Sequence, residues 1–224
     1  MIKCCIFDLD GVIVDTAKYH YLAWKRLANS FGFDFSEADN EHLKGVSRVE
    51  SLHLILQLGG VQLEQEVFDR ALVDKNCWYL EYVHQIGPEE ILPGVCELLA
   101  EVRALGIKTA LGSASKNAVL ILERIALQDQ FDAIVDGNNV SKAKPDPEVF
   151  LNAAREAGVA PADCLVFEDA VAGVQAALNA HMTVVGIGAS NLLHQAHLVI
   201  PDFQHVTIAQ LTTRLTAQLA QRIA

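Results

Sequence analysis

Positive charge is scarce in this 224-residue chain, which has 17 lysines and arginines against 28 aspartates and glutamates, a net charge of −11. Such an acidic surface repels nucleic acid and anionic membranes, so bulk charge argues against both as partners. Any anionic ligand would need a local cluster of cations. Long apolar runs are also missing, because none approaches membrane-spanning length and no signal segment follows Met1. We therefore expect a cytoplasmic protein without a membrane partner.

Cysteines with metal-binding or disulfide spacing are absent as well. The five cysteines are odd in number, have no CxxC spacing and mostly lie in apolar runs. This pattern favours buried, reduced thiols over a zinc site or a disulfide framework.

Apolar residues are abundant, at 51% of the chain, and charged residues make up 20%, which predicts a folded protein with a full core. After an apolar strand at the N-terminus, residues 16–84 show helical periodicity with no convincing strand. From residue 92 onward, strands at 107–112, 131–135, 164–167, 183–187 and 198–200 alternate with helices. This order predicts an α/β fold, a Rossmann-like parallel sheet with helices on both faces. We expect this core to span residues 1–14 and 92–224, and a small all-helical cap domain to span residues 15–91, inserted after the first strand.

The end of the first strand carries two acids, Asp8 and Asp10, separated by Leu9 and followed by Gly11. Side chains alternate along a strand, so both acids leave on the same face. They could remain ionised together if a hard cation such as Mg2+ offset their repulsion, and a carboxylate held there can act as a nucleophile. A solvated turn is an alternative for this pair alone. An EF-hand is excluded, because Gly11 stands at position 4 instead of 6.

Polar groups also follow the other strands of the expected sheet. They are Ser113 to Asn117, Lys144-Pro145 and Glu168-Asp169. Singly, these groups have ordinary explanations as helix caps, an exposed proline turn and acids at a helix start. The carboxyl ends of parallel strands share one edge of the sheet, so we expect all of them to converge there. Together they predict a phosphate and metal site.

Four strings stand in the order typical of the haloacid dehalogenase superfamily, which the whole chain resembles: Asp8 to Val12, Ser113, Lys144-Pro145, and Glu168 to Gly173. The resemblance implies that Asp8 becomes phosphorylated and that Asp10 is a general acid and base. It further implies that Ser113 and Lys144 hold the transferred phosphoryl group. One Mg2+ would be held by Asp8, the Asp10 backbone carbonyl and Asp169, with Glu168 assisting.

Within that superfamily, residues 15–24, 43–51 and 113–117 resemble the hexose-phosphate mutases. The resemblance implies interconversion of β-glucose 1-phosphate and glucose 6-phosphate, with β-glucose 1,6-bisphosphate as the activating intermediate. It associates Thr16, His20 and Lys75 with closure of the cap, although His20 and Lys75 could be ordinary solvated helix side chains. The substrate-binding residues expected from this resemblance are Thr16, His20, Trp24, Lys44, Gly45, Val46, Arg48, Ser51, Lys75, Ala114, Ser115, Lys116 and Asn117.

Arg48 separates a mutase from its nearest rival, a Mg2+-dependent sugar-phosphate phosphatase on the same fold. Ser47 and Glu50 form a capping-box pattern, which places Arg48 in the first turn of a helix. A phosphate there would meet unpaired backbone N–H groups and a guanidinium. Lys116 and Asn117 would face it from the core. A mutase must hold the phosphate that does not react, whereas a phosphatase needs only one phosphate site. The alternative explanation for Arg48 is an ordinary surface charge.

Two functions of other classes are weaker alternatives. A phospho-accepting signalling domain also combines acids, Mg2+, a hydroxyl and a lysine, but it is about half as long and has no helical insertion. A nucleotide-binding dehydrogenase is disfavoured because the glycines at 186 and 188 lack the third glycine of the fingerprint. We therefore expect a hexose phosphate as the substrate and a monomeric enzyme.

Overall fold

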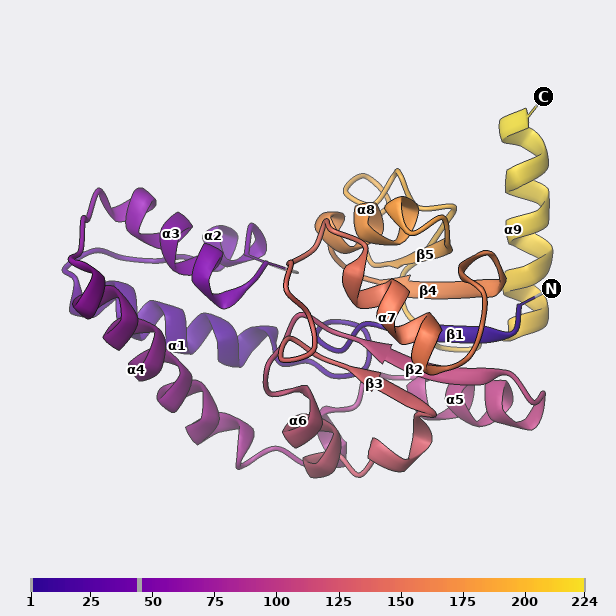
Figure 1. Cartoon of the computed structure of the whole chain (residues 1–224), viewed down its shortest axis with the longest axis horizontal. Helices are drawn as coiled ribbons and strands as arrows, with labels where there is room; N and C mark the ends of the chain where they lie inside the picture. The colour runs from indigo at the N-terminus through magenta and orange to yellow at the C-terminus, as the bar shows by residue number, and fades with distance from the viewer. Residues whose placement is uncertain (1, 44–45, 224) are drawn as a thin grey trace.

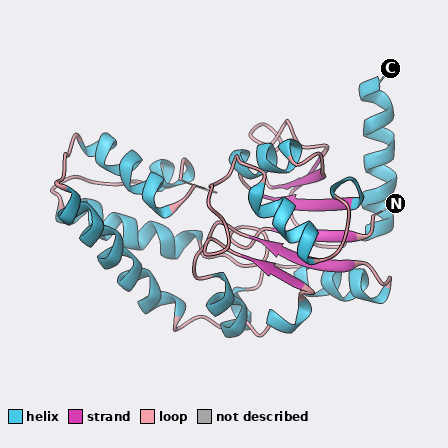
Figure 2. Ribbon diagram, viewed as in Figure 1, coloured by secondary structure: helices cyan, strands magenta, loops and turns pink. Residues whose placement is uncertain are grey.

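The computed structural model describes residues 2–43 and 46–223. Its helices and strands fall into two groups, as Figure 1 shows: α1 to α4 lie at one end of the molecule, and the sheet with its covering helices lies at the other. Figure 2 shows strands only in the second group. Both termini lie at the far side of the sheet from α1 to α4.

The sheet has six parallel strands in the order β3-β2-β1-β4-β5-β6, which confirms the predicted α/β class. The strands form where the sequence has short apolar runs that are buried along most of their length. They are β1 (Cys4–Phe7), β2 (Lys108–Gly112), β3 (Ala133–Val135), β4 (Cys164–Glu168), β5 (Thr183–Ile187) and β6 (Leu198–Ile200).

Helices cover both faces of the sheet. Alternation along β1 sends Cys5 and Phe7 to one face and Cys4 and Ile6 to the other. The first face packs against α5 (Val95–Ala104), α6 (Ala118–Arg124) and α9 (Ile208–Ile223), and the second packs against α7 (Glu148–Glu156) and α8 (Val171–Asn179). Short 3-10 helices lie at η1 (Pro88–Glu90), η2 (Gln128–Gln130) and η3 (Pro161–Asp163).

Helices α1 (Ala17–Ser30), α2 (Glu37–Glu41), α3 (Arg48–Gly59) and α4 (Gln65–Val83) connect β1 to the rest of the core. They enclose an apolar cluster of their own, which includes Trp24, Phe35, Leu52 and Phe68. Helix α3 begins as the sequence predicts, because the Ser47 side chain accepts a hydrogen bond from the Glu50 backbone N–H. We propose that these four helices form the cap and that the two domains divide as the sequence predicts.

The five-residue helix α2 was not predicted. It begins with a capping box, in which Ser36 and Asp39 each accept a hydrogen bond from the other's backbone N–H. A helix of five residues is too short to show apolar periodicity. Its capping box marks where it begins, but no repeat of apolar residues follows to predict a helix.

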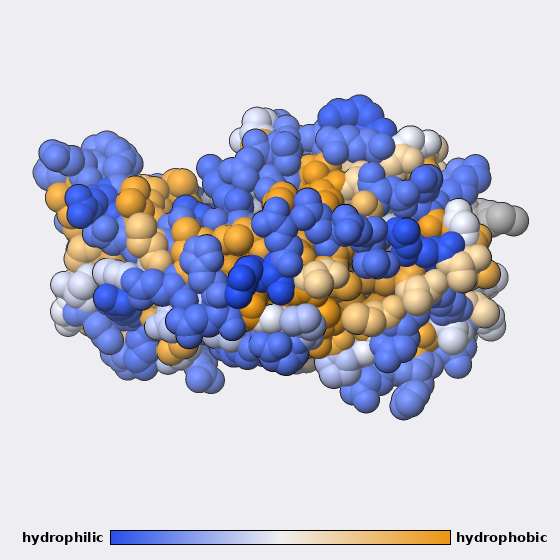
Figure 3. Space-filling model, turned by 90° about the horizontal axis from the view of Figure 1, so that it is seen from below, coloured by the Kyte–Doolittle hydropathy of each residue, from blue (hydrophilic) through white to orange (hydrophobic). Residues whose placement is uncertain are grey.

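Among the described residues, no helix is both long enough and apolar enough to cross a membrane. Figure 3 shows hydrophilic side chains over much of the face seen from below, with hydrophobic ones gathered along its middle.

Candidate active site

The carboxyl end of β1 places Asp8 beside a buried lysine. The Lys144 Nζ donates to Asp8 Oδ1 at 2.7 Å and to Glu168 Oε2 at 3.3 Å. All three side chains are buried, so the alternative of an exposed lysine in a proline turn is wrong for Lys144. Burial alone would lower the pKa of Lys144, but Asp8 and Glu168 together raise it above its ordinary value. Lys144 therefore stays a cation next to the predicted nucleophile.

Three acids could hold a metal ion. One carboxylate oxygen from each of Asp8, Glu168 and Asp169 lies within 4.8 Å of the others. Burial, with Asp8 close by, raises the pKa of Glu168 well above its ordinary value. Glu168 Oε1 is buried and has no hydrogen-bond partner among the described residues. An oxygen-preferring cation would satisfy that atom and offset the repulsion, so this donor set fits Mg2+.

Two glycines leave room for these carboxylates. A Cβ built on Gly11, whose φ is +78°, would overlap the Asp169 carboxylate. A Cβ built on Gly173, in the first turn of α8, would overlap Glu168 Oε1. Only glycine at these two positions allows the chain to approach the acidic group so closely.

Asp10 points away from the acidic group toward the cap. Its carboxylate accepts a hydrogen bond from the Thr16 hydroxyl and lies 3.9 Å from His20 Nε2. Burial and the nearby Asp8 raise the pKa of Asp10 to about 6, although the Thr16 hydrogen bond, Lys144 and Lys75 oppose the shift. Asp10 can therefore hold or release a proton near neutral pH, as acid–base catalysis requires. Metal binding through its backbone carbonyl stays a prediction.

A chain of contacts connects Asp10 to the inside of the cap. The Lys75 Nζ lies 2.9 Å from His20 Nδ1 and 4.4 Å from the centre of the Trp24 ring. Lys75 is 2% exposed, so the alternative of a solvated helix side chain is wrong for it. Burial, with Arg48 close by, lowers the pKa of Lys75 well below its ordinary value, and burial with Lys75 does the same to His20.

The loop after β2 forms the facing wall. Ser113 is buried, and its Oγ accepts from the Ser115 backbone N–H at 3.1 Å. The Ser115 Oγ in turn accepts from the Asn117 backbone N–H at 3.2 Å. These are local bonds within the loop, because α6 begins after Asn117 without a side-chain capping bond, so the explanation of the two serines as helix caps is wrong. The whole segment from Ser113 to Asn117 lines the cavity.

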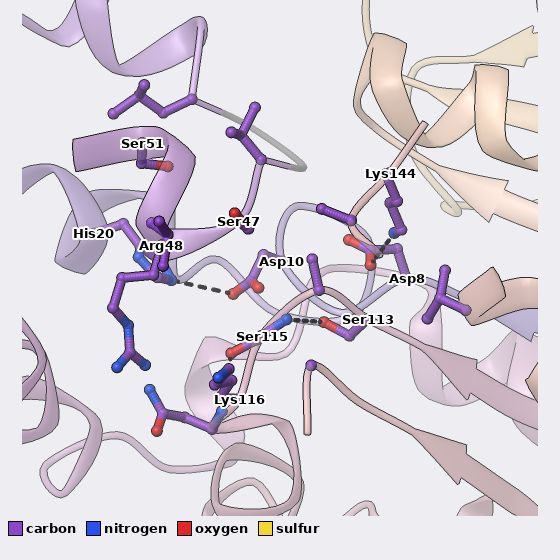
Figure 4. Close-up of a pocket in the computed structure, with 18 of the residues that line it drawn as sticks. Asp8, Asp10, His20, Ser47, Arg48, Ser51, Ser113, Ser115, Lys116 and Lys144 are labelled. Atoms are coloured by element: carbon purple, nitrogen blue, oxygen red, sulfur yellow. Dashed lines mark hydrogen bonds and ion pairs between the residues drawn. The ribbon is translucent and has the colours of Figure 1, made fainter. Parts of the chain in front are cut away.

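A cavity of about 400 Å3 joins the two walls. In Figure 4, Asp8, Ser113 and Lys144 lie on one side of it, and His20, Ser47, Arg48 and Ser51 lie on the other. Of the predicted substrate-binding residues, Thr16 lies behind Asp10 and does not line the cavity, and Lys44 and Gly45 fall outside the described residues. The rest line it: His20, Trp24, Val46, Arg48, Ser51, Lys75, Ala114, Ser115, Lys116 and Asn117.

Two cations in this cavity have no acid partner. Among residues 2–43 and 46–223, neither Arg48 nor Lys116 forms an ion pair, although the chain has a large excess of acids. Figure 4 shows Arg48 extending from the cap toward the side where Lys116 lies. That Arg48 and Lys116 together form a second anion site, apart from Lys144, stays a prediction.

Two residues that the sequence did not single out, Asn76 and Asn138, form hydrogen bonds to the loop that carries Lys116 and Asn117. The Asn117 Nδ2 donates to Asn76 Oδ1 at 3.1 Å, which joins the facing loop to α4 of the cap. The Asn138 Nδ2 donates to the Lys116 backbone carbonyl at 3.0 Å. Neither asparagine stands in a motif, and only its position next to Lys75 distinguishes Asn76.

Residues 2–181 match the sequence model of the haloacid dehalogenase-like hydrolase family. The chain belongs to this family. It is 44% identical to the β-phosphoglucomutase of Bacillus subtilis (strain 168), over 92% of each chain. It is 32% identical to a phosphorylated carbohydrates phosphatase of Thermotoga maritima, over 80% of this chain and 81% of the relative.

A solved structure agrees in fold over nearly the whole chain. The crystal structure of β-phosphoglucomutase from Clostridium difficile superposes with a TM-score of 0.93 and 40% identity. The match covers 98% of this chain and all of the other. The predicted superfamily and its mutase branch are therefore confirmed.

Proposed function

We propose that this haloacid dehalogenase-family protein interconverts β-D-glucose 1-phosphate and D-glucose 6-phosphate, the activity of a β-phosphoglucomutase. The observation that carries the proposal is that two separate sets of cations line one cavity. Lys144 lies against Asp8 at one side. Arg48 and Lys116 lie at the other, and neither has an acid partner within the described part of the chain. A sugar bisphosphate has two phosphates to bind, one at each site. The relatives that are mutases support the same assignment.

Asp8 is the proposed nucleophile. One of its oxygens attacks the phosphorus atom of β-glucose 1,6-bisphosphate, and the bond from phosphorus to the sugar oxygen breaks with its electron pair remaining on that oxygen. Protonated Asp10 gives its proton to the departing oxygen, so a monophosphate and an aspartyl phosphate form. In the reverse direction, Asp10 takes the proton from the attacking hydroxyl of the other monophosphate.

Fixed cations and donors stabilise the charge of the phosphoryl group during transfer. Lys144 and the Ser113 hydroxyl face the phosphoryl oxygens, because both adjoin Asp8 at the end of the sheet. Asp8, Glu168 and Asp169 would hold Mg2+, which when bound neutralises phosphate charge. Closure of the cap would exclude water and so protect the aspartyl phosphate from hydrolysis.

A sugar-phosphate phosphatase is the second candidate. The Thermotoga maritima relative is named a phosphatase, and the same nucleophile and metal site would serve hydrolysis if water reached the aspartyl phosphate. The sequence-based predictions of a cytoplasmic location and a monomeric state stay predictions.

The test supplies purified protein with β-glucose 1-phosphate, Mg2+ and a trace of β-glucose 1,6-bisphosphate, and follows glucose 6-phosphate and free phosphate together. A mutase gives glucose 6-phosphate in large excess over phosphate, and Asp8→Asn abolishes it. Release of phosphate in step with the loss of substrate would establish the phosphatase instead.

A further inference from the structure

Asn40 is a buried polar residue that the proposed chemistry does not use. It is 7% exposed and is the buried residue of the short helix α2 in the cap. Its backbone is fully engaged, because its N–H donates to the Ser36 carbonyl at 3.2 Å and its carbonyl accepts from the Leu43 N–H at 3.0 Å. Within the described part of the chain, no hydrogen bond reaches its side-chain amide.

The cap contributes both apolar and polar side chains to the lining of the cavity. Asn40 lines the cavity together with the apolar cap residues Trp24, Leu43 and Leu72. Ser51, which is 3% exposed, is a second polar cap residue there, and no described group bonds its hydroxyl. The Asn40 amide is not among the fully buried unpaired atoms of the described residues, so it is open to the cavity that it lines. A neutral polar ligand in the cavity would supply the hydrogen-bond partner that the described residues do not.

The ligand chemistry follows from the amide itself. A side-chain amide both donates and accepts, and so does a hydroxyl group, whereas a phosphate at neutral pH mainly accepts. The cations for phosphates lie elsewhere in the cavity, at Lys144 and at Arg48 with Lys116. Resting on the proposed function, we infer that Asn40 is a specificity residue that hydrogen-bonds a ring hydroxyl of the sugar.

The experiment compares the wild type with Asn40→Leu, which keeps the approximate size but removes the amide. kcat/KM is measured for β-glucose 1-phosphate and for analogues that each lack one ring hydroxyl. Loss of one buried hydrogen bond lowers kcat/KM about tenfold. We expect Asn40→Leu to lower kcat/KM by about that factor for the parent sugar. For the one analogue that lacks the contacted hydroxyl, we expect the variant and the wild type to have the same kcat/KM.

Two controls separate a sugar contact from a structural role. Phosphorylation of Asp8 by acetyl phosphate, which has no sugar, is expected to be unchanged in Asn40→Leu. His42→Gln alters an exposed residue beside the same helix and is expected to match the wild type on every substrate. Asn40→Ser, which removes the amide but stays polar, provides the same test if circular dichroism shows that Asn40→Leu does not fold.

Three results would overturn the inference: unchanged turnover of the parent sugar, an equal loss on acetyl phosphate, or an equal loss on every analogue. Failure of the Asn40 inference can be told apart from failure of the proposed mutase function. If the wild type releases phosphate instead of moving it, the mutase proposal fails. The same comparison across analogues can then be made on released phosphate, and it still tests Asn40.

Discussion

Gly173 has no side chain, and the Glu168 carboxylate of the proposed metal site occupies the space where a Cβ would lie. Replacing Gly173 with alanine would place a Cβ on Glu168 Oε1, so the carboxylate must move away from Asp8 and Asp169. We expect Gly173→Ala to weaken Mg2+ binding at least about tenfold, because displaced ligand groups typically cost that much affinity. Calorimetric titration with Mg2+ measures it. Gln175→Ala in the same helix is the control, and an unchanged affinity in Gly173→Ala would contradict this account of the acidic group.

Arg48 is predicted to bind the phosphate that does not react. Removing a guanidinium that makes charge-assisted hydrogen bonds costs about 10-fold to 100-fold in affinity. We therefore expect Arg48→Ala to raise the KM for β-glucose 1,6-bisphosphate by that factor, and Arg48→Lys to give a smaller rise because it keeps the charge but not the planar fork. Steady-state kinetics measures both variants.

The control for Arg48 is Arg70→Ala, which removes an exposed arginine from the cap helix α4. Phosphorylation of Asp8 by acetyl phosphate uses a single phosphate and is expected to be insensitive to Arg48. If Arg48→Ala leaves the bisphosphate KM unchanged, Arg48 is an ordinary surface charge and the second anion site does not exist.

Single residues could be predicted where a motif assigns them a chemical role. Asp8, Lys144, Glu168 and Asp169 stand in strings whose order indicates their chemistry, and the structure brings them together. Their supporting contacts could not be predicted. The unpaired Glu168 Oε1 depends on which way the carboxylate turns, and the sequence carries no signal for that.

Helix α4 and the loop after β2 meet through the hydrogen bond from Asn117 to Asn76. This contact joins cap to core beside the cavity, so its loss favours opening of the cap. We expect Asn76→Ala to raise the sugar-phosphate KM several-fold, since one neutral hydrogen bond contributes about 1 kcal/mol, and to release more free phosphate per turnover. Cys77→Ala, an exposed neighbour, is the control. Equal phosphate release from Asn76→Ala and wild type would show that the contact does not restrain the cap.

Glu90, near the end of the predicted cap, forms a pH-dependent contact with helix α1. Its carboxylate accepts from Lys18 Nζ at 2.6 Å and from the Tyr19 hydroxyl at 2.7 Å. Burial alone would raise the pKa of Glu90, but these two donors lower it below its ordinary value. A carboxyl whose pKa is lower in the folded state stabilises the fold above its unfolded pKa, and that stability is lost as the pH falls through the folded pKa.

We therefore expect Glu90→Gln to lower the free energy of unfolding by about 1 kcal/mol at pH 7. The difference from wild type is expected to stay constant near neutral pH. It shrinks only as the pH falls below the ordinary pKa of 4.5 and through the lower pKa of the folded state, where the wild-type carboxyl becomes protonated. Urea unfolding at several pH values measures it. The exposed neighbour Glu89→Gln is the control, and a difference that does not depend on pH would rule out the titration of Glu90 as its cause.

The helices and strands that could be predicted were those long enough to show a repeat or run of apolar residues. The strands were found from short apolar runs, and β5 and β6 agree with the predicted ranges. The predicted strand at 131–135 is shorter in the structure, because Phe131 and Asp132 form the connection between η2 and β3. Helix α2 was missed, since five residues cannot show a repeat of 3.6.

At the scale of the whole molecule, the order of elements was enough to predict a parallel sheet with a helical insertion. A strand followed by a long helical stretch and then by alternating elements has few folded solutions. The contacts that join the two groups of helices could not be predicted. The bond between Asn117 and Asn76, for example, depends on how the insertion lies against the sheet, and this is set by packing over many residues.

The central claim is that the phosphoryl group on Asp8 passes to a sugar and not to water. A single-turnover measurement tests it most directly: Asp8 is first phosphorylated with acetyl phosphate in the presence of Mg2+, and β-glucose 1-phosphate is then added. We expect most of the phosphoryl group to appear in β-glucose 1,6-bisphosphate and then in glucose 6-phosphate. If most of it appears as free phosphate while β-glucose 1-phosphate is saturating, the protein is a phosphatase and not a mutase.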